Sequence, residues 1–188
     1  TKDSAYTPIK RLNLLPSANF AYNFTRNKTL RFFYNGNANQ PSFSQLQPVK
    51  DVSNPQYQTQ GNPLLKPELA HIFSLSFNNL NFLTGQTFFI GSNFNFTHNQ
   101  IVNNTIRVGN NGSQLTTYDN VNGAYSASGF YNFSKPWSNR TYILSFNGTA
   151  AYNNNITLID NVQNFAKTLL FAQGGKMEFN WKDWLEFD

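Results

Sequence analysis

Apolar and polar residues alternate with a period of two over long stretches of this chain. In the segment Asn19–Phe24, Phe20, Tyr22 and Phe24 alternate with small or polar residues. Because successive side chains of a β-strand point to opposite faces, this period predicts strands with one aromatic face and one small or polar face. Helical spacing is sustained nowhere for more than two turns. The pattern predicts an all-β fold.

The alternation divides the chain into seven predicted strands. They are Arg11 to Thr25, Thr29 to Asn39, Leu69 to Leu80, Gln86 to Arg107, Gln114 to Ser134, Thr141 to Thr157 and Phe165 to Trp181. Several of them are much longer than the mean strand of soluble proteins, which has about 5 to 6 residues. A strand tilted across a bilayer needs about 9 to 11 residues, and barrel strands often extend beyond the membrane. The strand lengths therefore favour a membrane barrel over a compact sandwich.

The connectors between these strands are uneven. Short turns are expected on one side of the sheet, at Arg26 to Lys28, Asn81 to Gly85 and Lys135 to Arg140. Longer connectors are expected on the other side, at Gln40 to Glu68, Val108 to Ser113 and Leu158 to Asn164. Outer-membrane barrels have short turns at one rim and long loops at the other. We therefore expect an antiparallel meander with nearest-neighbour pairing, forming a fragment of a transmembrane outer-membrane barrel.

Each predicted strand carries a small or polar face, as at Asn93, Asn95 and Thr97. In a wide barrel this face would line a wet lumen, and the aromatic face would meet lipid and supply the interfacial girdles. A soluble antiparallel sheet with one packed and one solvated face would show the same alternation. Strand length and the uneven connectors, rather than the alternation, favour the membrane interpretation.

Composition excludes several classes of protein. The chain has 188 residues, no cysteine, 12% charged residues and 16% aromatic residues, so it is neither a disulfide scaffold nor a disordered segment. The net charge of +5 comes from scattered Lys and Arg residues, which form no stripe that could follow a phosphate backbone. We therefore expect no nucleic-acid partner.

No catalytic or metal-binding constellation is present in the sequence. His71 and His98 are the only histidines, and each is interpreted as a strand residue. The acidic residues are dispersed, and Glu178 and Glu186 near the chain end do not form a predicted cleft. Gly174-Gly175 lacks a following helix and is therefore a turn or bulge signal. We expect no enzyme activity, no cofactor and no metal.

Residues 14 to 80 resemble a known family in specific phrases. These are Leu15-Pro16-Ser17, Leu30-Arg31-Phe32-Phe33-Tyr34-Asn35, Asn39-Gln40-Pro41-Ser42-Phe43-Ser44-Gln45-Leu46 and Gly61-Asn62-Pro63-Leu64-Leu65-Lys66-Pro67-Glu68. They resemble the barrel portion of TonB-dependent receptor-like outer-membrane proteins of Bacteroidetes, and the last phrase is the most specific. The candidate site residues of this family-motif loop are Pro41, Ser42, Gly61, Asn62, Pro63, Lys66, Pro67 and Glu68.

The resemblance implies a large barrel that takes up metal chelates, peptides or glycans and is driven by the inner-membrane TonB system. Its partners would be outer-membrane lipid, a plug domain and further barrel strands. These residues contain no plug domain, TonB box or signal peptide, and the substrate stays unknown. Residues 1–188 are thus expected to be part of one barrel domain, with a strand missing before Arg11 and a further strand opening at Trp184 to Phe187 and cut at Asp188. Unpaired edges are expected to make the isolated fragment aggregate or dimerise.

The longest segment without alternation, Gln40 to Glu68, is expected to be an ordered outer loop over the barrel rim or lumen. Its prolines exclude a central strand and a helix of any length; they are Pro41, Pro48, Pro55, Pro63 and Pro67. We expect Gly61-Asn62-Pro63 to turn the chain and Lys66-Pro67-Glu68 to deliver it into the strand at Leu69. The loop is either a lid that contacts a partner or a structural plug of the rim.

A second function class remains open, namely a secreted carbohydrate-binding or adhesive β-domain. Aromatic and amide side chains bind sugars by stacking and by paired hydrogen bonds. The candidates near loops are Tyr118, Asp119, Asn120 and Trp137. The competing interpretation is that these are girdle or turn residues.

Overall fold

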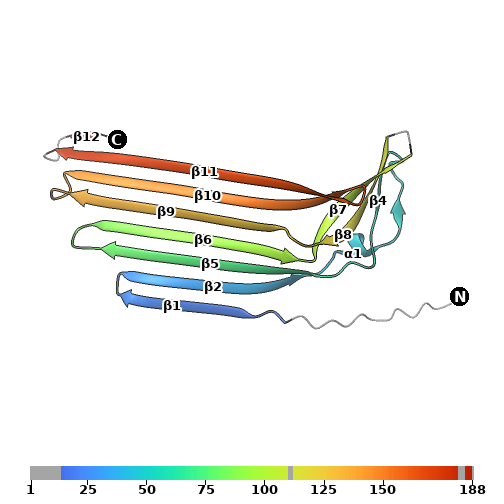
Figure 1. The fold of residues 1–188 in the computed structure, drawn as a ribbon, viewed down its shortest axis with the longest axis horizontal. Coiled ribbons are helices and arrows are strands. Elements are labelled where there is room, and N and C mark those ends of the chain that lie inside the picture. Colours follow the sequence, from blue (N-terminus) through green and yellow to red (C-terminus); the bar gives the residue numbers. More distant parts are fainter. Residues whose placement is uncertain (1–13, 110–111, 182–184, 188) are drawn as a thin grey trace.

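Almost all of the described chain is β-structure (Figure 1). The computed structural model describes residues 14–109, 112–181 and 185–187. The strands are β1 (Ser17–Thr25), β2 (Lys28–Asn39), β3 (Lys50–Asp51), β4 (Tyr57–Gln60), β5 (Glu68–Asn81), β6 (Gln86–His98), β7 (Gln100–Val108), β8 (Ser113–Val121), β9 (Tyr125–Trp137), β10 (Tyr142–Ile159), β11 (Val162–Trp181) and β12 (Leu185–Phe187). The one helix among the described residues is α1 (Phe43–Leu46). The predicted all-β class is confirmed.

Seven long strands form the body of the sheet, in the order β1-β2-β5-β6-β9-β10-β11, and each is antiparallel to the next. Figure 1 shows them side by side, with short turns at one end. This order confirms the predicted meander of long strands. The further strand expected near the chain end is β12, which pairs with β11; Trp184, Asp188 and the predicted start of the first strand at Arg11 lie outside the described residues.

Two of the predicted strands are each broken into two, which corrects the predicted ranges. Gln86 to Arg107 is interrupted at Asn99, where φ is 54°, and Gln114 to Ser134 is interrupted near Gly123, where φ is 106°. Asn and Gly tolerate this left-handed region better than other residues. The Asn99 amide donates to Asn122 Oδ1 at 2.8 Å, so the two breaks are held side by side. Beyond these breaks, β7 and β8 pair with each other as a hairpin that turns away from the long strands (Figure 1).

The β7–β8 hairpin forms parallel pairs with other strands, which the predicted antiparallel meander did not include. β7 pairs in parallel with the end of β10, where Asn104 is opposite Leu158. β8 pairs in parallel with β4, where Leu115 is opposite Gln58. The sheet is therefore mostly, and not purely, antiparallel. Alternation indicates which residues of a strand share a face, but it does not indicate which other strand pairs with that strand.

Two predicted connectors also differ in the structure. Leu158 to Asn164 was expected to be a longer loop, but the turn consists of Asp160 and Asn161, at φ 51° and 63°, between β10 and β11. Positive φ at both central residues is the geometry of a two-residue hairpin turn. The prolines of Gln40 to Glu68 do not exclude regular structure either, because α1, β3 and β4 form between them.

The cross-strand register separates two faces of the long strands. The aromatic face carries Phe20, Tyr22, Phe32, Tyr34, Phe73, Phe77, Phe88, Phe94, Phe96, Tyr131, Phe133, Phe146, Tyr152 and Phe171. The polar face carries, besides Phe33, Phe89 and Phe130, the residues Asn23, Thr29, Ser74, Ser76, Asn93, Asn95, Ser126, Ser128, Asn132, Ser134, Ser145, Asn147, Thr149 and Asn153. Rings of adjacent strands contact one another, as at Tyr34 and Phe73, whose centroids are 4.6 Å apart.

Neighbouring polar side chains on the other face form hydrogen bonds across strands. Ser74 Oγ donates to Asn93 Oδ1 at 2.7 Å, and Ser145 Oγ lies 2.9 Å from Ser134 Oγ. The buried apolar cluster is small and lies where the β7–β8 hairpin meets β10; its members are Val102, Val121, Ala124, Ile156 and Leu158. Stability of the long strands therefore comes from ladders and cross-strand pairs rather than from an enclosed core.

Gly148 in β10 leaves room for Tyr131 to lie across the strand. A Cβ at this position would lie 2.6 Å from Tyr131 Cε1, and the Tyr131 hydroxyl donates to Gln173 Oε1 at 2.7 Å. Gly148→Val is expected to displace the ring, break that hydrogen bond and lower the free energy of unfolding by about 1 to 3 kcal/mol. Heat-dependent gel migration of the full-length barrel measures the loss.

Gly175→Val provides a matched control on the same face. A Cβ at Gly175 would meet Phe146 at 3.5 Å, which is an ordinary contact. This variant is expected to unfold close to the wild-type temperature. Equal destabilisation by the two substitutions would contradict the packing role of Gly148.

Candidate functional site

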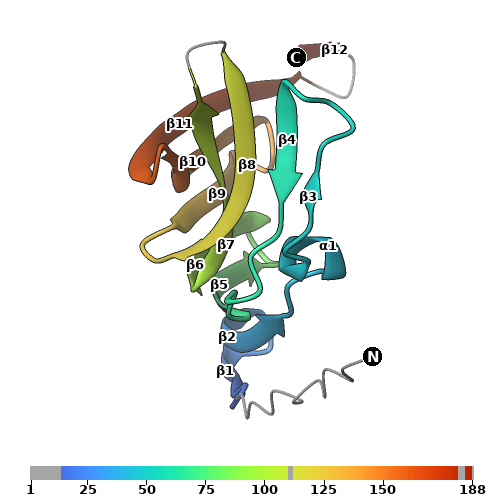
Figure 2. The same ribbon diagram turned by 90° about the vertical axis from the view of Figure 1, so that its right-hand side faces the viewer.

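The candidate site lies at the long-loop end of the sheet. We define the rim assembly as residues 40–67 together with the β7–β8 hairpin, residues 100–121. Figure 2 looks onto this end and shows the sheet as an arc, with α1, β3 and β4 on its hollow side. The described part of the loop therefore lies over the hollow side of the sheet at this end, and its role as an outer loop of a barrel stays a prediction.

The family-motif loop begins with a capped helical turn after Pro41. Ser42 Oγ accepts from the Gln45 amide at 3.3 Å, and Gln45 Oε1 accepts from the Ser42 amide at 2.9 Å. This reciprocal pair is a capping box, which satisfies amides that a helix start leaves free. Ser42 therefore fixes the first turn of α1.

Gly61 closes the loop back onto α1. Its amide donates to Gln47 O at 3.0 Å, and the Asn62 amide donates to Gln45 O at 2.6 Å. A Cβ at Gly61 would lie 2.5 Å from Gln47 O and 2.7 Å from Gln45 O. Backbone atoms cannot move aside as a side chain can, so only glycine fits this position.

Asn62 connects the closed loop to the hairpin. Its Nδ2 donates to Tyr118 O at 3.0 Å, and its Oδ1 accepts from the Leu64 amide at 2.9 Å. The second bond turns the chain through Pro63, as the sequence predicts. The loop is thus anchored to β8 by a side chain as well as by the β4–β8 pairing.

Lys66 and Glu68 fix the return of the chain into β5. Asn120 Oδ1 accepts from the Lys66 amide at 2.7 Å, and Asn120 Nδ2 donates to Lys66 O at 3.0 Å and to Asn99 O at 2.7 Å. Glu68 Oε1 accepts from the Ile101 amide at 2.7 Å. Pro67 is buried between these two contacts. The functional role of the eight motif residues stays a prediction, but the structure gives most of them positions that hold the loop.

The loop exposes several large apolar side chains. Their exposed fractions are 79% for Phe43, 64% for Val49, 59% for Tyr57 and 81% for Leu64. Near them, the Ser53 hydroxyl and amide donate to Asp51 Oδ1 at 2.7 and 2.9 Å and hold the pKa of that carboxyl below its ordinary value. These exposed apolar side chains have the chemistry of a contact surface.

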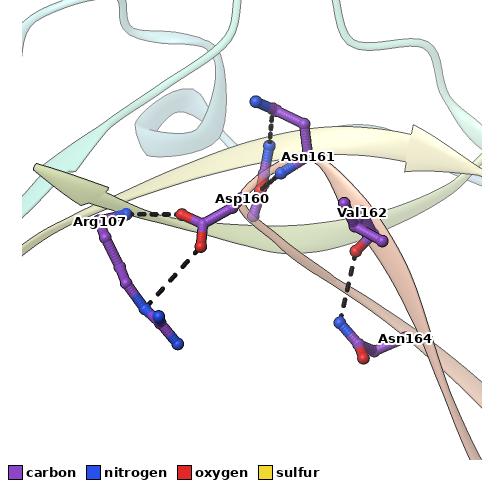
Figure 3. Close-up of polar contacts among 6 residues, drawn as sticks. Arg107, Asp160, Asn161, Val162 and Asn164 are labelled. Carbon is purple, nitrogen blue, oxygen red and sulfur yellow. Dashed lines mark hydrogen bonds and ion pairs between the residues drawn. The ribbon is translucent and has the colours of Figure 1, made fainter.

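A second anchor joins the β10–β11 turn to β7 (Figure 3). Asp160 Oδ1 accepts from the Arg107 amide at 2.8 Å, and Arg107 Nε lies 3.8 Å from Asp160 Oδ2. Asn104 Nδ2 donates to Asn161 Oδ1 at 2.7 Å. Sequence reasoning missed this contact, although the adjacent Asp160 and Asn161 between two apolar stretches are a signal for a tight turn.

Asp160→Ala is expected to loosen β7 from this turn. The carboxylate accepts a hydrogen bond from a backbone amide, and such a bond contributes a net stabilisation of about 0.5 to 1.5 kcal/mol. The exposed ion pair adds little. Loss of about 1 kcal/mol would make hydrogen exchange at the Arg107 amide roughly fivefold faster. Asp160→Asn keeps an acceptor and should exchange near the wild-type rate; equal rates in both variants would contradict this role.

The structure separates the candidates for sugar binding. Tyr118 and Asn120 lie together on β8, but the Tyr118 backbone carbonyl and the Asn120 side-chain amide already anchor the loop. Asp119 Oδ1 accepts from the backbone amide of Asn120 at 2.8 Å. Trp137 lies at the opposite end of the long strands, where β9 ends. These residues do not form one site.

Both histidines lie in strands, His71 in β5 and His98 at the end of β6. His71 Nδ1 lies 2.9 Å from the Tyr34 hydroxyl, and its ring stacks on Phe96 with centroids 4.6 Å apart. Within residues 14–109, 112–181 and 185–187, no three His, Cys, Asp or Glu side chains gather in a way that could hold a metal ion. No helix in the same ranges is long and apolar enough to cross a membrane.

Comparison with known proteins gives one family and one fold. The model of a family described as outer membrane protein beta-barrel matches residues 1–184. The crystal structure of the siderophore receptor PirA from Pseudomonas aeruginosa is similar, with 14% sequence identity and a TM-score of 0.55. The match covers 91% of this chain and 37% of the receptor chain, so the chain spans little more than a third of that receptor's length. No curated protein matches the chain.

Proposed function

The chain belongs to the outer membrane protein beta-barrel family, and from this premise we propose that it is part of the barrel of a TonB-dependent receptor that takes up nutrients. Its location is the outer membrane. Residues 1–188 form part of a single barrel domain in this proposal. A plug domain, the remaining barrel strands and the TonB system act with it in the full-length protein.

The two-faced sheet carries this proposal. Rows of rings on one face suit contact with lipid, and rows of Asn, Ser and Thr on the other suit a hydrated lumen. The likeness in fold to part of a siderophore receptor supports the same interpretation. The polar face contacts the substrate on its way through the barrel, which is transport rather than catalysis.

The rim assembly contributes an outer lid in this proposal. The motif residues Ser42, Gly61, Asn62, Lys66 and Glu68 hold the loop, while exposed side chains such as Phe43 and Leu64 contact the substrate or a partner. Metal chelates, peptides and glycans remain the candidate substrates. The secreted carbohydrate-binding alternative is set aside because the chain belongs to an outer-membrane family.

Uptake assays of the full-length protein test this function. A strain without the gene, the complemented strain and a strain without TonB are compared for accumulation of a ferric siderophore, an oligopeptide and an oligosaccharide, each radiolabelled. We expect accumulation of one class to require both the gene and TonB. Unchanged accumulation of all three in the gene-deleted strain, or uptake that needs the gene but not TonB, would overturn the proposal.

A further inference from the structure

A lysine and a tryptophan lie together on the aromatic face at the short-turn end of β9. The Lys135 ammonium is 4.9 Å from the centroid of the Trp137 ring. Lys135 is opposite Leu144, and Trp137 is opposite Tyr142, so all of these side chains share one face. A fixed cation therefore lies beside an apolar surface at the end of the barrel strands.

The apolar surface next to Lys135 is hollowed. An open hollow of about 260 Å³ is lined by Trp137, Tyr142, Ile143, Leu144 and Met177. Its walls are accessible, with exposed fractions of 42% for Trp137 and 62% for Met177. The hollow spans β9, β10 and β11; β10 is paired on both sides, and β11 pairs with β10 and, at Phe179 to Trp181, with β12.

Charge is distributed unequally between the two ends of the described strands. Lys28 lies at the same end as Lys135, with its ammonium 5.2 Å from the centroid of Phe24. Glu178 is on the polar face there and forms an ion pair with Lys176 at 3.2 Å. Glu186 in β12 is at this end too, opposite Asn180, whereas Asp51, Glu68, Asp119 and Asp160 are at the long-loop end. The short-turn end of the aromatic face is therefore complementary to an anion.

We propose that the hollow binds one phospholipid of the periplasmic leaflet, with its phosphate at Lys135 Nζ and an acyl chain against Trp137, Tyr142, Leu144 and Met177. The proposal rests on the outer-membrane location and on short turns being periplasmic in such barrels. At this depth the aromatic face meets the boundary between headgroups and acyl chains. A long lysine side chain there reaches toward the headgroups while its stem stays on apolar surface.

Native mass spectrometry of the full-length protein in detergent tests the site with two added lipids. These are phosphatidylglycerol and a diacylglycerol with the same chains but no phosphate. We expect preferential binding of phosphatidylglycerol, and Lys135→Gln should weaken it about fivefold because one lysine near a membrane surface contributes about that much. The same variant should bind diacylglycerol as the wild type does.

Lys167→Gln is the matched control, because Lys167 lies on the same face of β11 near its other end, opposite Asn154. It should leave phosphatidylglycerol binding unchanged. Leu144→Trp should fill the hollow and weaken both lipids alike, with heat-resistant gel migration as the folding check. Equal binding of the two lipids by the wild type, or equal weakening by Lys135→Gln and Lys167→Gln, would overturn the proposal. Neither result depends on whether the protein transports a nutrient.

Discussion

Replacing Asn120 by alanine is expected to release the outer loop while leaving the long strands folded. The Asn120 amide group bonds to Lys66 N, Lys66 O and Asn99 O, and so joins the loop, the hairpin and the break after β6. Loss of these bonds leaves backbone groups unpaired, at a cost of about 2 to 3 kcal/mol. Proteolysis within residues 42–60 should become roughly 30- to 150-fold faster, because cleavage follows the population of the open loop.

Two further variants sharpen this result. Asn120→Asp keeps the acceptor for Lys66 N but puts an oxygen against the carbonyls of Lys66 and Asn99, so it should be cleaved at least as fast as Asn120→Ala. Asn103→Ala removes an exposed amide from the same hairpin and should be cleaved at the wild-type rate. If Asn120→Ala also behaved as wild type, the three bonds would not anchor the loop.

Deleting Ser42 to Gln60 is expected to abolish uptake while the barrel still assembles. The deletion removes α1, β3 and β4; β3 pairs with β4 and β4 pairs with β8, and neither strand pairs with any of the seven long strands. It retains Asn62, Lys66 and Glu68, whose bonds to the hairpin hold the start of β5. Gel migration that stays heat-resistant, with accumulation of the substrate at the level of the gene-deleted strain, is the expected pair of results.

A linker of Gly and Ser with the deleted length is the control for this experiment. It restores the spacing but cannot form α1 or pair with β8, so uptake should remain lost. A barrel that no longer assembles after the deletion would instead assign the loop the structural role of sealing the rim. Normal uptake by a folded deletion variant would contradict the lid.

The long strands could be predicted from the sequence because their two faces differ in chemistry. Phe20, Tyr22 and Phe24 occupy alternate positions and so share one face. Phe73 and Phe94, which are opposite each other, lie on the same face of the sheet. The breaks at Asn99 and Gly123 could not be predicted, since the alternation continues on both sides of them. The two breaks are joined by a bond from the Asn99 amide to Asn122, which lies in the connector between β8 and β9 and is distant in sequence.

The candidate site was only partly accessible from sequence. The motif residues Gly61 and Asn62 were predicted to turn the chain. They do so where their backbone amides donate hydrogen bonds to the carbonyl oxygens of Gln47 and Gln45. Asn120, which bonds to both backbone groups of Lys66, was considered as a sugar ligand or as a girdle or turn residue, but not as an anchor of the loop. Asparagine is abundant throughout this sequence, so nothing local distinguishes an anchoring residue from one that lines the polar face.

In the intact barrel, the aromatic face is expected to meet lipid and the polar face to meet water. The chain contains no cysteine, so single cysteines can be placed along β10 in a cysteine-free full-length background. In intact outer membranes, a water-soluble maleimide should label Asn147→Cys, Thr149→Cys and Ala151→Cys. It should leave Phe146→Cys, Ala150→Cys and Tyr152→Cys unlabelled until detergent is added. Equal labelling of both sets before detergent would contradict this assignment of the two faces.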